Sequence, residues 1–159
     1  MSRSYLPRST MPWQPETRRA AWMALAGPAA NFTLMILAGI SIRVGMAFGV
    51  FQPPMRIEFT HITEAVVPGG AAFAATFLSI LFVLNLLLGT FNLLPLPPLD
   101  GHNAITLFMS DEAARRFLGW TRQGFGFAGL ILAWFLFDKV FDRVFLLALN
   151  LLYPGAGYG

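Results

Sequence analysis

The chain has 159 residues, of which 56% are hydrophobic and 12% charged, with a formal net charge of +3 and no cysteine. Ordinary soluble domains carry about 25% charged residues, so the composition indicates a single membrane-embedded domain. The absence of cysteine excludes a disulfide framework and a thiolate metal site. No basic run is interleaved with aromatic residues, which argues against a nucleic-acid partner.

Residues 1–21 form a polar segment with three prolines and four arginines. No apolar stretch closely follows the first basic residues, so the segment is not a secretory signal peptide. We predict a flexible basic arm that leads into the membrane.

Residues 22–46 are predicted to form the first membrane helix. The uncharged run from Trp22 to Ile42 is about 31 Å long as a helix, which is enough to span a bilayer. Pro28 is expected to kink or unwind the helix near its start, and Asn31 to bond the backbone groups that the proline frees. The helix is rich in small residues, so Gly27 and Pro28 also fit a packing notch that carries no chemistry.

Residues 50–70 are predicted to form a loop, with a short strand over 56–62 where apolar and polar residues partly alternate. His61 and Glu64 have the His-x-x-Glu spacing of an inverted zinc motif. That motif continues with a second histidine, and the chain has Ala65 there. The pattern therefore favours a polar loop histidine over a metal ligand.

Residues 71–95 are predicted to form the second membrane helix, because residues 71–94 carry no charge. Asn85 lies in the middle of this run. We expect its amide to bond to another helix, since lipid offers it no partner.

The second predicted helix ends at a proline-rich segment, which a single carboxylate residue follows. Pro95 and two further prolines remove backbone donors, and Asn92 is placed to supply a side-chain amide. Gly101 is expected to permit a tight turn. A carboxylate such as Asp100 at the end of an apolar run is costly unless it is paired, metal-bound or hydrated. It therefore indicates either a functional site or a hydrated helix end.

Residues 102–122 are polar, and Ser110 is a candidate N-cap for a short surface helix with acidic residues in its first turn. His102 lies two residues after Asp100. It is a candidate fourth group near a metal, a proton relay or a surface residue.

Residues 123–153 allow two interpretations, because four charged residues at 138–143 interrupt an apolar run. We prefer a tilted third span over 121–138 followed by an interfacial helix over 139–153. The other interpretation is one long helix with its charges hidden inside the protein. The predicted fold class is therefore all-α, a polytopic membrane protein with about three spans.

Basic residues set the expected orientation of this multi-pass cell-membrane protein. Four arginines precede the first span and three follow the second, whereas the loop between them has only Arg56, with Arg43 at the membrane edge. The N-terminus and Asp100 are therefore expected on the cytoplasmic side, and Arg43 is expected to extend to the interface.

Two motifs carry a resemblance to a known family. The string Asn92-Leu93-Leu94-Pro95 followed by Leu99-Asp100-Gly101 resembles the third-ligand motif of the site-2 proteases, which are intramembrane zinc metalloproteases. Upstream, Gly27-Pro28-Ala29-Ala30-Asn31 is similar to the Gly-Pro-x-x-Asn element of the same family. The two motifs occur in the family's order and at about its spacing.

The resemblance implies that Asp100 is a zinc ligand and that the chain is one site-2-protease-like domain. Gly27, Pro28, Asn31, Asn92, Pro95, Leu99 and Gly101 are the implied motif residues. The family's other ligands and its general base come from a His-Glu-x-x-His helix, which these 159 residues lack. We therefore expect an N-terminally incomplete domain that has no catalytic residue of its own and does not retain zinc alone.

Three hypotheses about function follow. The first is a truncated intramembrane zinc endopeptidase that cuts membrane-anchored substrates once a missing upstream helix segment is supplied. The second is a non-catalytic relative that binds transmembrane segments. The third is an unrelated small transport protein that uses Asp100 for ion or solute movement.

Overall fold

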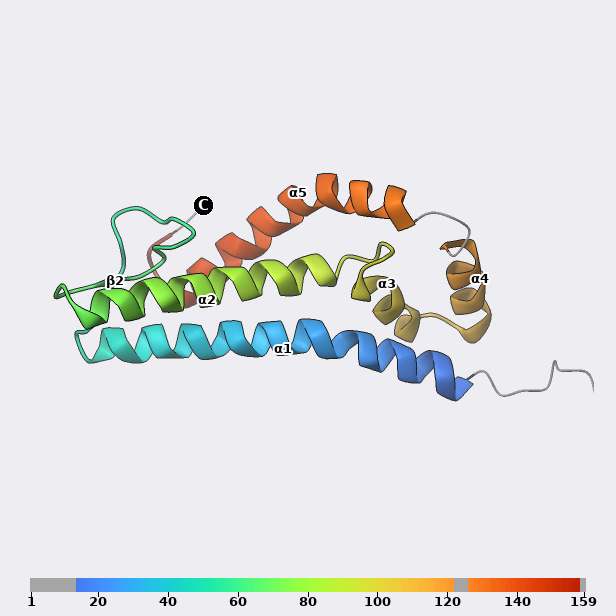
Figure 1. Cartoon of the computed structure of the whole chain (residues 1–159), viewed down its shortest axis with the longest axis horizontal. Coiled ribbons are helices and arrows are strands. Elements are labelled where there is room, and N and C mark those ends of the chain that lie inside the picture. The colour runs from blue at the N-terminus through green and yellow to red at the C-terminus, as the bar shows by residue number, and fades with distance from the viewer. Residues whose placement is uncertain (1–13, 122–125, 158–159) are drawn as a thin grey trace, which may run out of the picture.

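The computed structural model describes residues 14–121 and 126–157, and the fold is mostly helical. Two long helices lie side by side as an antiparallel pair, and a third long helix crosses over the second of them (Figure 1). The elements are α1 (Gln14–Ala47), β1 (Phe51–Gln52), β2 (Glu64–Ala65), α2 (Gly70–Asn92), α3 (Asp100–Ala104), the 3-10 helix η2 (Ile105–Phe108), α4 (Asp111–Thr121) and α5 (Gly126–Leu152).

Two of the helices are long and apolar enough to cross a membrane, by length and composition. They are Arg18–Ala47 within α1 and the whole of α2. The sequence predicted both with errors of a few residues at α2 and more at the start of α1. Residues 14–21 belong to α1, so that part of the predicted flexible arm is helical, as the helix-forming Ala20 and Ala21 favour. The rest of the predicted arm, residues 1–13, lies outside the described residues.

The prediction of two separate helices after residue 121 is wrong, because α5 is continuous from Gly126 to Leu152. The alternative of buried charges is also wrong, since Asp138, Lys139, Asp142 and Arg143 are all exposed. No proline or glycine interrupts 130–152, and lysine and arginine are good helix formers, so the charged residues do not break the helix.

A small hairpin replaces the strand predicted over 56–62. β1 and β2 pair antiparallel, with Phe51 opposite Ala65 and Gln52 opposite Glu64. Between them the chain forms a loop with one isolated bridge, Glu58 to His61. Alternation over a few residues is a weak strand signal, and here the ladder forms only at the ends of the loop.

Ser79 of α2 fixes this loop to the helix pair. Its buried Oγ accepts hydrogen bonds from the backbone N–H groups of Ile62 (3.1 Å) and Thr63 (3.3 Å), and donates to the carbonyl of Ala75 (2.8 Å). The hydroxyl thus satisfies two buried backbone donors that no strand ladder reaches.

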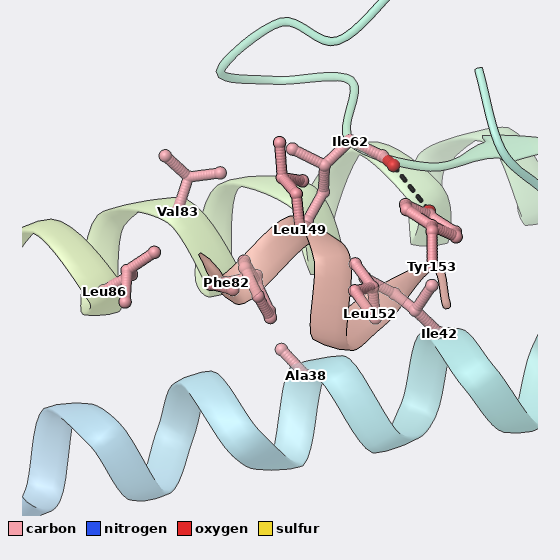
Figure 2. Packing of buried hydrophobic residues seen from close by; sticks show 10 residues of the cluster. Ala38, Ile42, Ile62, Phe82, Val83, Leu86, Leu149, Leu152 and Tyr153 are labelled. Atoms are coloured by element: carbon pink, nitrogen blue, oxygen red, sulfur yellow. Dashed lines mark hydrogen bonds between the residues drawn. The ribbon is translucent and has the colours of Figure 1, made fainter. Parts of the chain in front are cut away.

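The main core lies where α1, α2, the loop and the end of α5 meet. Ala38 and Ile42 of α1 face Phe82 of α2 and Leu152 of α5 (Figure 2). Next to them, the hydroxyl of Tyr153 donates a 2.6 Å hydrogen bond to the carbonyl of Ile62. The end of α5 is therefore tied to the same loop that Ser79 holds.

Replacing Ser79 by alanine is expected to destabilise the protein by about 1–3 kcal/mol, because two buried N–H groups lose their acceptor. Unfolding of the purified chain in mixed micelles, followed by circular dichroism, measures this. Ser41→Ala is the matched control. Ser41 makes the same bond to the carbonyl four residues earlier (2.8 Å) but is exposed and accepts nothing from the loop. Equal losses of stability for the two variants would contradict the assigned role of Ser79.

Candidate functional site

Asp100 is the first residue of α3, and its half-buried carboxylate lies against α1. A Cβ atom built on Gly27 would be only 3.1 Å from Oδ2 of Asp100. Because glycine has no side chain, the carboxylate can approach the backbone of α1 directly. The structure thus brings the two sequence motifs together at one place.

The carboxylate of Asp100 has no partner within residues 14–121 and 126–157. It makes no hydrogen bond there, and the ion pair found in that part of the chain joins Arg116 to Glu112 on the surface of α4. An ionised carboxylate only accepts hydrogen bonds, and its burial is costly without a donor or cation. Asp100 is therefore chemically suited to receive a cation.

The turn between α2 and α3 is held by short-range hydrogen bonds. The N–H of Leu96 donates to the carbonyl of Leu94 (2.8 Å), and the N–H of Leu99 donates to the carbonyl of Leu96 (2.9 Å). Leu94 and Leu99 are buried against Ala133 of α5, whereas Pro95 is exposed. Leu99 thus anchors the residue next to Asp100, and Pro95 contributes by ending α2.

Gly101 serves close packing, and the prediction that it provides a turn conformation is wrong. It is not among the described glycines with positive φ. A Cβ atom at Gly101 would lie 2.2 Å from the carbonyl oxygen of Leu93. Glycine is needed because the backbone of α3 lies directly on the end of α2.

The three asparagines do not bond as predicted. In the described part of the chain, the half-buried side chains of Asn31 and Asn92 make no hydrogen bond. The amide of Asn85 donates to the carbonyl of Leu81 (2.8 Å) in its own helix and not to another helix. Pro28 is buried inside α1, which is continuous, so the predicted unwinding does not occur. The N-terminal part of α1 is bent (Figure 1).

His102 is directed to α4. Its Nε2 is 2.7 Å from Oγ1 of Thr121, and that hydroxyl in turn donates to the carbonyl of Phe117 (3.0 Å). The imidazole therefore donates to the threonine and packs on the ring of Phe117, with centroids 4.9 Å apart. Burial lowers the pKa of His102 below its ordinary value, which favours the neutral ring. His102 is thus a buried residue that is hydrogen-bonded to Thr121, and the alternative of a surface residue is wrong.

The patterns in the sequence did not indicate the roles of two residues of this region. Thr121 is separated from His102 by a whole helix, so no local pattern indicates their contact. Thr90 has a buried hydroxyl without a hydrogen-bond partner in the described residues. Its only signal in the sequence is a polar residue in an apolar run.

The described residues alone do not fit a zinc site. A catalytic zinc takes three protein ligands and a water. Within residues 14–121 and 126–157, no three His, Asp or Glu side chains lie together. His61 is exposed in the loop at the other end of α2, where its Nδ1 lies 2.8 Å from Oγ1 of Thr60 (Figure 1). Asp100 therefore offers one ligand, and we assign no hydrolytic step to these residues.

Comparison with known families gives a match over most of the chain. The model of the family described as "Peptidase family M50", the site-2 protease family, matches residues 9–136. The match includes both motifs and all elements from α1 to the first half of α5. Searches among curated proteins and among solved structures gave no significant match.

Gly101→Ala is expected to destabilise the protein by about 1–3 kcal/mol or more, because the new methyl group meets backbone atoms that cannot rotate away. The matched control is Gly119→Ala in α4, where a Cβ atom meets nothing within 4 Å. That change is expected to be neutral or stabilising by about 0.5–1 kcal/mol. Denaturation of both variants in mixed micelles tests the pair, and a stable Gly101→Ala protein would refute the close contact.

Proposed function

The chain belongs to peptidase family M50, and on that premise we propose that it is the aspartate-bearing part of an intramembrane zinc metalloprotease. In this proposal Asp100 is one zinc ligand. The other ligands and the general base come from a segment with a His-Glu-x-x-His helix, supplied upstream or by a separate polypeptide. The substrates are membrane-anchored proteins.

The position of Asp100 carries this proposal. Its carboxylate lies against Gly27, is half-buried and has no partner among the described residues. A side chain held in this way between two helices is ready to bind a metal without first breaking another interaction. When bound, zinc would activate a water and polarise the scissile carbonyl.

The second hypothesis, a non-catalytic relative that binds transmembrane segments, stays as the alternative. The described residues show one potential ligand at the motif and no group of three, which is compatible with either view. Family membership argues against the third hypothesis, an unrelated transport protein.

We further propose a multi-pass membrane protein with a cytoplasmic N-terminus. The exposed Arg18, Arg19, Arg115 and Arg116 lie on α1 and α4 at one end of the molecule, and the loop lies at the other end (Figure 1). Cytoplasmic segments carry the excess of arginine and lysine. Asp100 lies at the same end as these arginines, near the cytoplasmic face.

The chain purified alone is expected to bind zinc far below one ion per chain, because a single carboxylate is a weak site. Together with a His-Glu-x-x-His segment encoded beside it, the complex should hold zinc, and Asp100→Asn should lower the affinity at least about tenfold. Mass spectrometry of metals measures the zinc content.

Glu58→Gln is the control for this experiment, since it removes an exposed carboxylate of the loop, at the opposite end of the molecule from α3 (Figure 1). Unchanged zinc binding in the Asp100→Asn complex would refute the role of Asp100. If the DNA beside the gene encodes no His-Glu-x-x-His segment, the non-catalytic alternative is favoured.

The orientation can be tested because the chain contains no cysteine. Single cysteines at Met55, fully exposed in the loop, and at Glu112, exposed on α4, should label from opposite sides of the membrane. In intact cells a membrane-impermeant maleimide should label Met55→Cys and leave Glu112→Cys unlabelled. The reverse pattern would contradict the proposed orientation.

A further inference from the structure

An open groove of about 350 Å³ lies on the outer side of the helix pair, away from Asp100. Residues of α1 between Met35 and Val44 form one wall of the groove, and residues of the last turn of α5 form the other. Phe82 of α2 closes the bottom. Apart from Arg43, every lining residue is apolar or glycine, and the volume is within the range of about 300–1,000 Å³ that small-molecule sites occupy.

Arg43 gives this groove one charged end. Its Nη1 donates a 2.9 Å hydrogen bond to the carbonyl of Leu152, the last residue of α5. The side chain is exposed, and no carboxylate within the described residues forms an ion pair with it. A guanidinium has five N–H donors, so most of them stay available to an anion that arrives from outside. This fork of donors can bind a phosphate through two parallel hydrogen bonds.

The length of the groove matches half a bilayer. From Met35 to Val44 a helix rises by about 14 Å, which is close to half of the roughly 30 Å hydrocarbon core. Arg43 and Val44 lie near the end of the apolar segment Arg18–Ala47, at the membrane edge. Phe82 lies near the middle of α2. The groove therefore runs from the headgroup level to the middle of the membrane.

We propose that this groove binds one anionic phospholipid of the leaflet on the loop side. An acyl chain lies along Ile36, Ile40 and Leu151, and the phosphate is bound by the guanidinium of Arg43. A transmembrane segment of a partner or a second copy would continue across both leaflets and would not need a cation at one end. The inference rests on the membrane location in the proposed function and is independent of zinc and proteolysis.

The test reconstitutes the chain into vesicles of equal parts phosphatidylglycerol and phosphatidylcholine, extracts it in mild detergent and counts the retained lipids by native mass spectrometry. The wild-type chain is expected to retain phosphatidylglycerol over phosphatidylcholine by about tenfold, because the choline cation of phosphatidylcholine neutralises its headgroup and repels the guanidinium of Arg43. Arg43→Gln should abolish this preference. Ile40→Trp, which fills the groove at an exposed position and leaves the bond from Arg43 to Leu152 intact, should reduce retention of both lipids.

Arg56→Gln is the matched control, because Arg56 is an exposed arginine of the same loop end that does not line the groove. It should retain lipid like the wild type. The inference is overturned if the wild type shows no preference, if Arg56→Gln loses it as Arg43→Gln does, if Ile40→Trp retains lipid normally, or if a lipid-free dimer is recovered. If the chain inserts into the vesicles but does not prefer phosphatidylglycerol, only the proposed lipid site is overturned. If the chain does not insert into the vesicles, the proposed membrane location is overturned as well.

Discussion

Close approach of the backbone at Gly27 and Gly101 is the constraint on which the site depends. Gly101 lets α3 lie on the carbonyl of Leu93, and this contact directs the residue before it, Asp100, toward α1. Gly27 then leaves room for the carboxylate where any other residue would place a side chain. The proline-rich turn makes this return possible, because it ends α2 and frees the chain to reverse. Among the described residues, the carboxylate of Asp100 is thus held in place by packing and not by a hydrogen bond or ion pair.

The opposite end of the molecule is held by polar contacts. Ser79 of α2 and Tyr153, the residue after α5, bind the backbone of Ile62, and Arg43 binds the carbonyl of Leu152, the last residue of α5. Each of these side chains satisfies a backbone group that no regular ladder reaches, as the interior of a membrane protein requires. Because α5 is fixed there, its last turn forms a wall beside α1, and the proposed lipid groove is a consequence of the same contacts.

The two ends have different chemistry for a physical reason. At the arginine-rich end, the turn leaves Asp100 with its lone pairs available, which suits a metal supplied with further ligands. At the loop end, side chains bind backbone groups of Ile62 and Thr63, and the exposed guanidinium of Arg43 lies beside the groove. The proposed metal site and the proposed lipid groove therefore lie on different parts of α1, the first at Gly27 and the second from Met35 onward.

The sequence by itself determined the features that depend on local signals. Uncharged runs predicted both apolar helices, and the prolines predicted the end of α2. The prediction that Ser110 caps α4 is confirmed, because the N–H of Ala113 lies 3.4 Å from Oγ of Ser110. The two motifs indicated the family, and the proximity of Asp100 and Gly27 agrees with it. The role of Asp100 as a zinc ligand stays a prediction. Tertiary structure decided the pairing of His102 with Thr121 and the use of Gly101 for contact instead of for a turn. These depend on residues that are distant in the sequence and meet only after packing, so no local pattern could specify them.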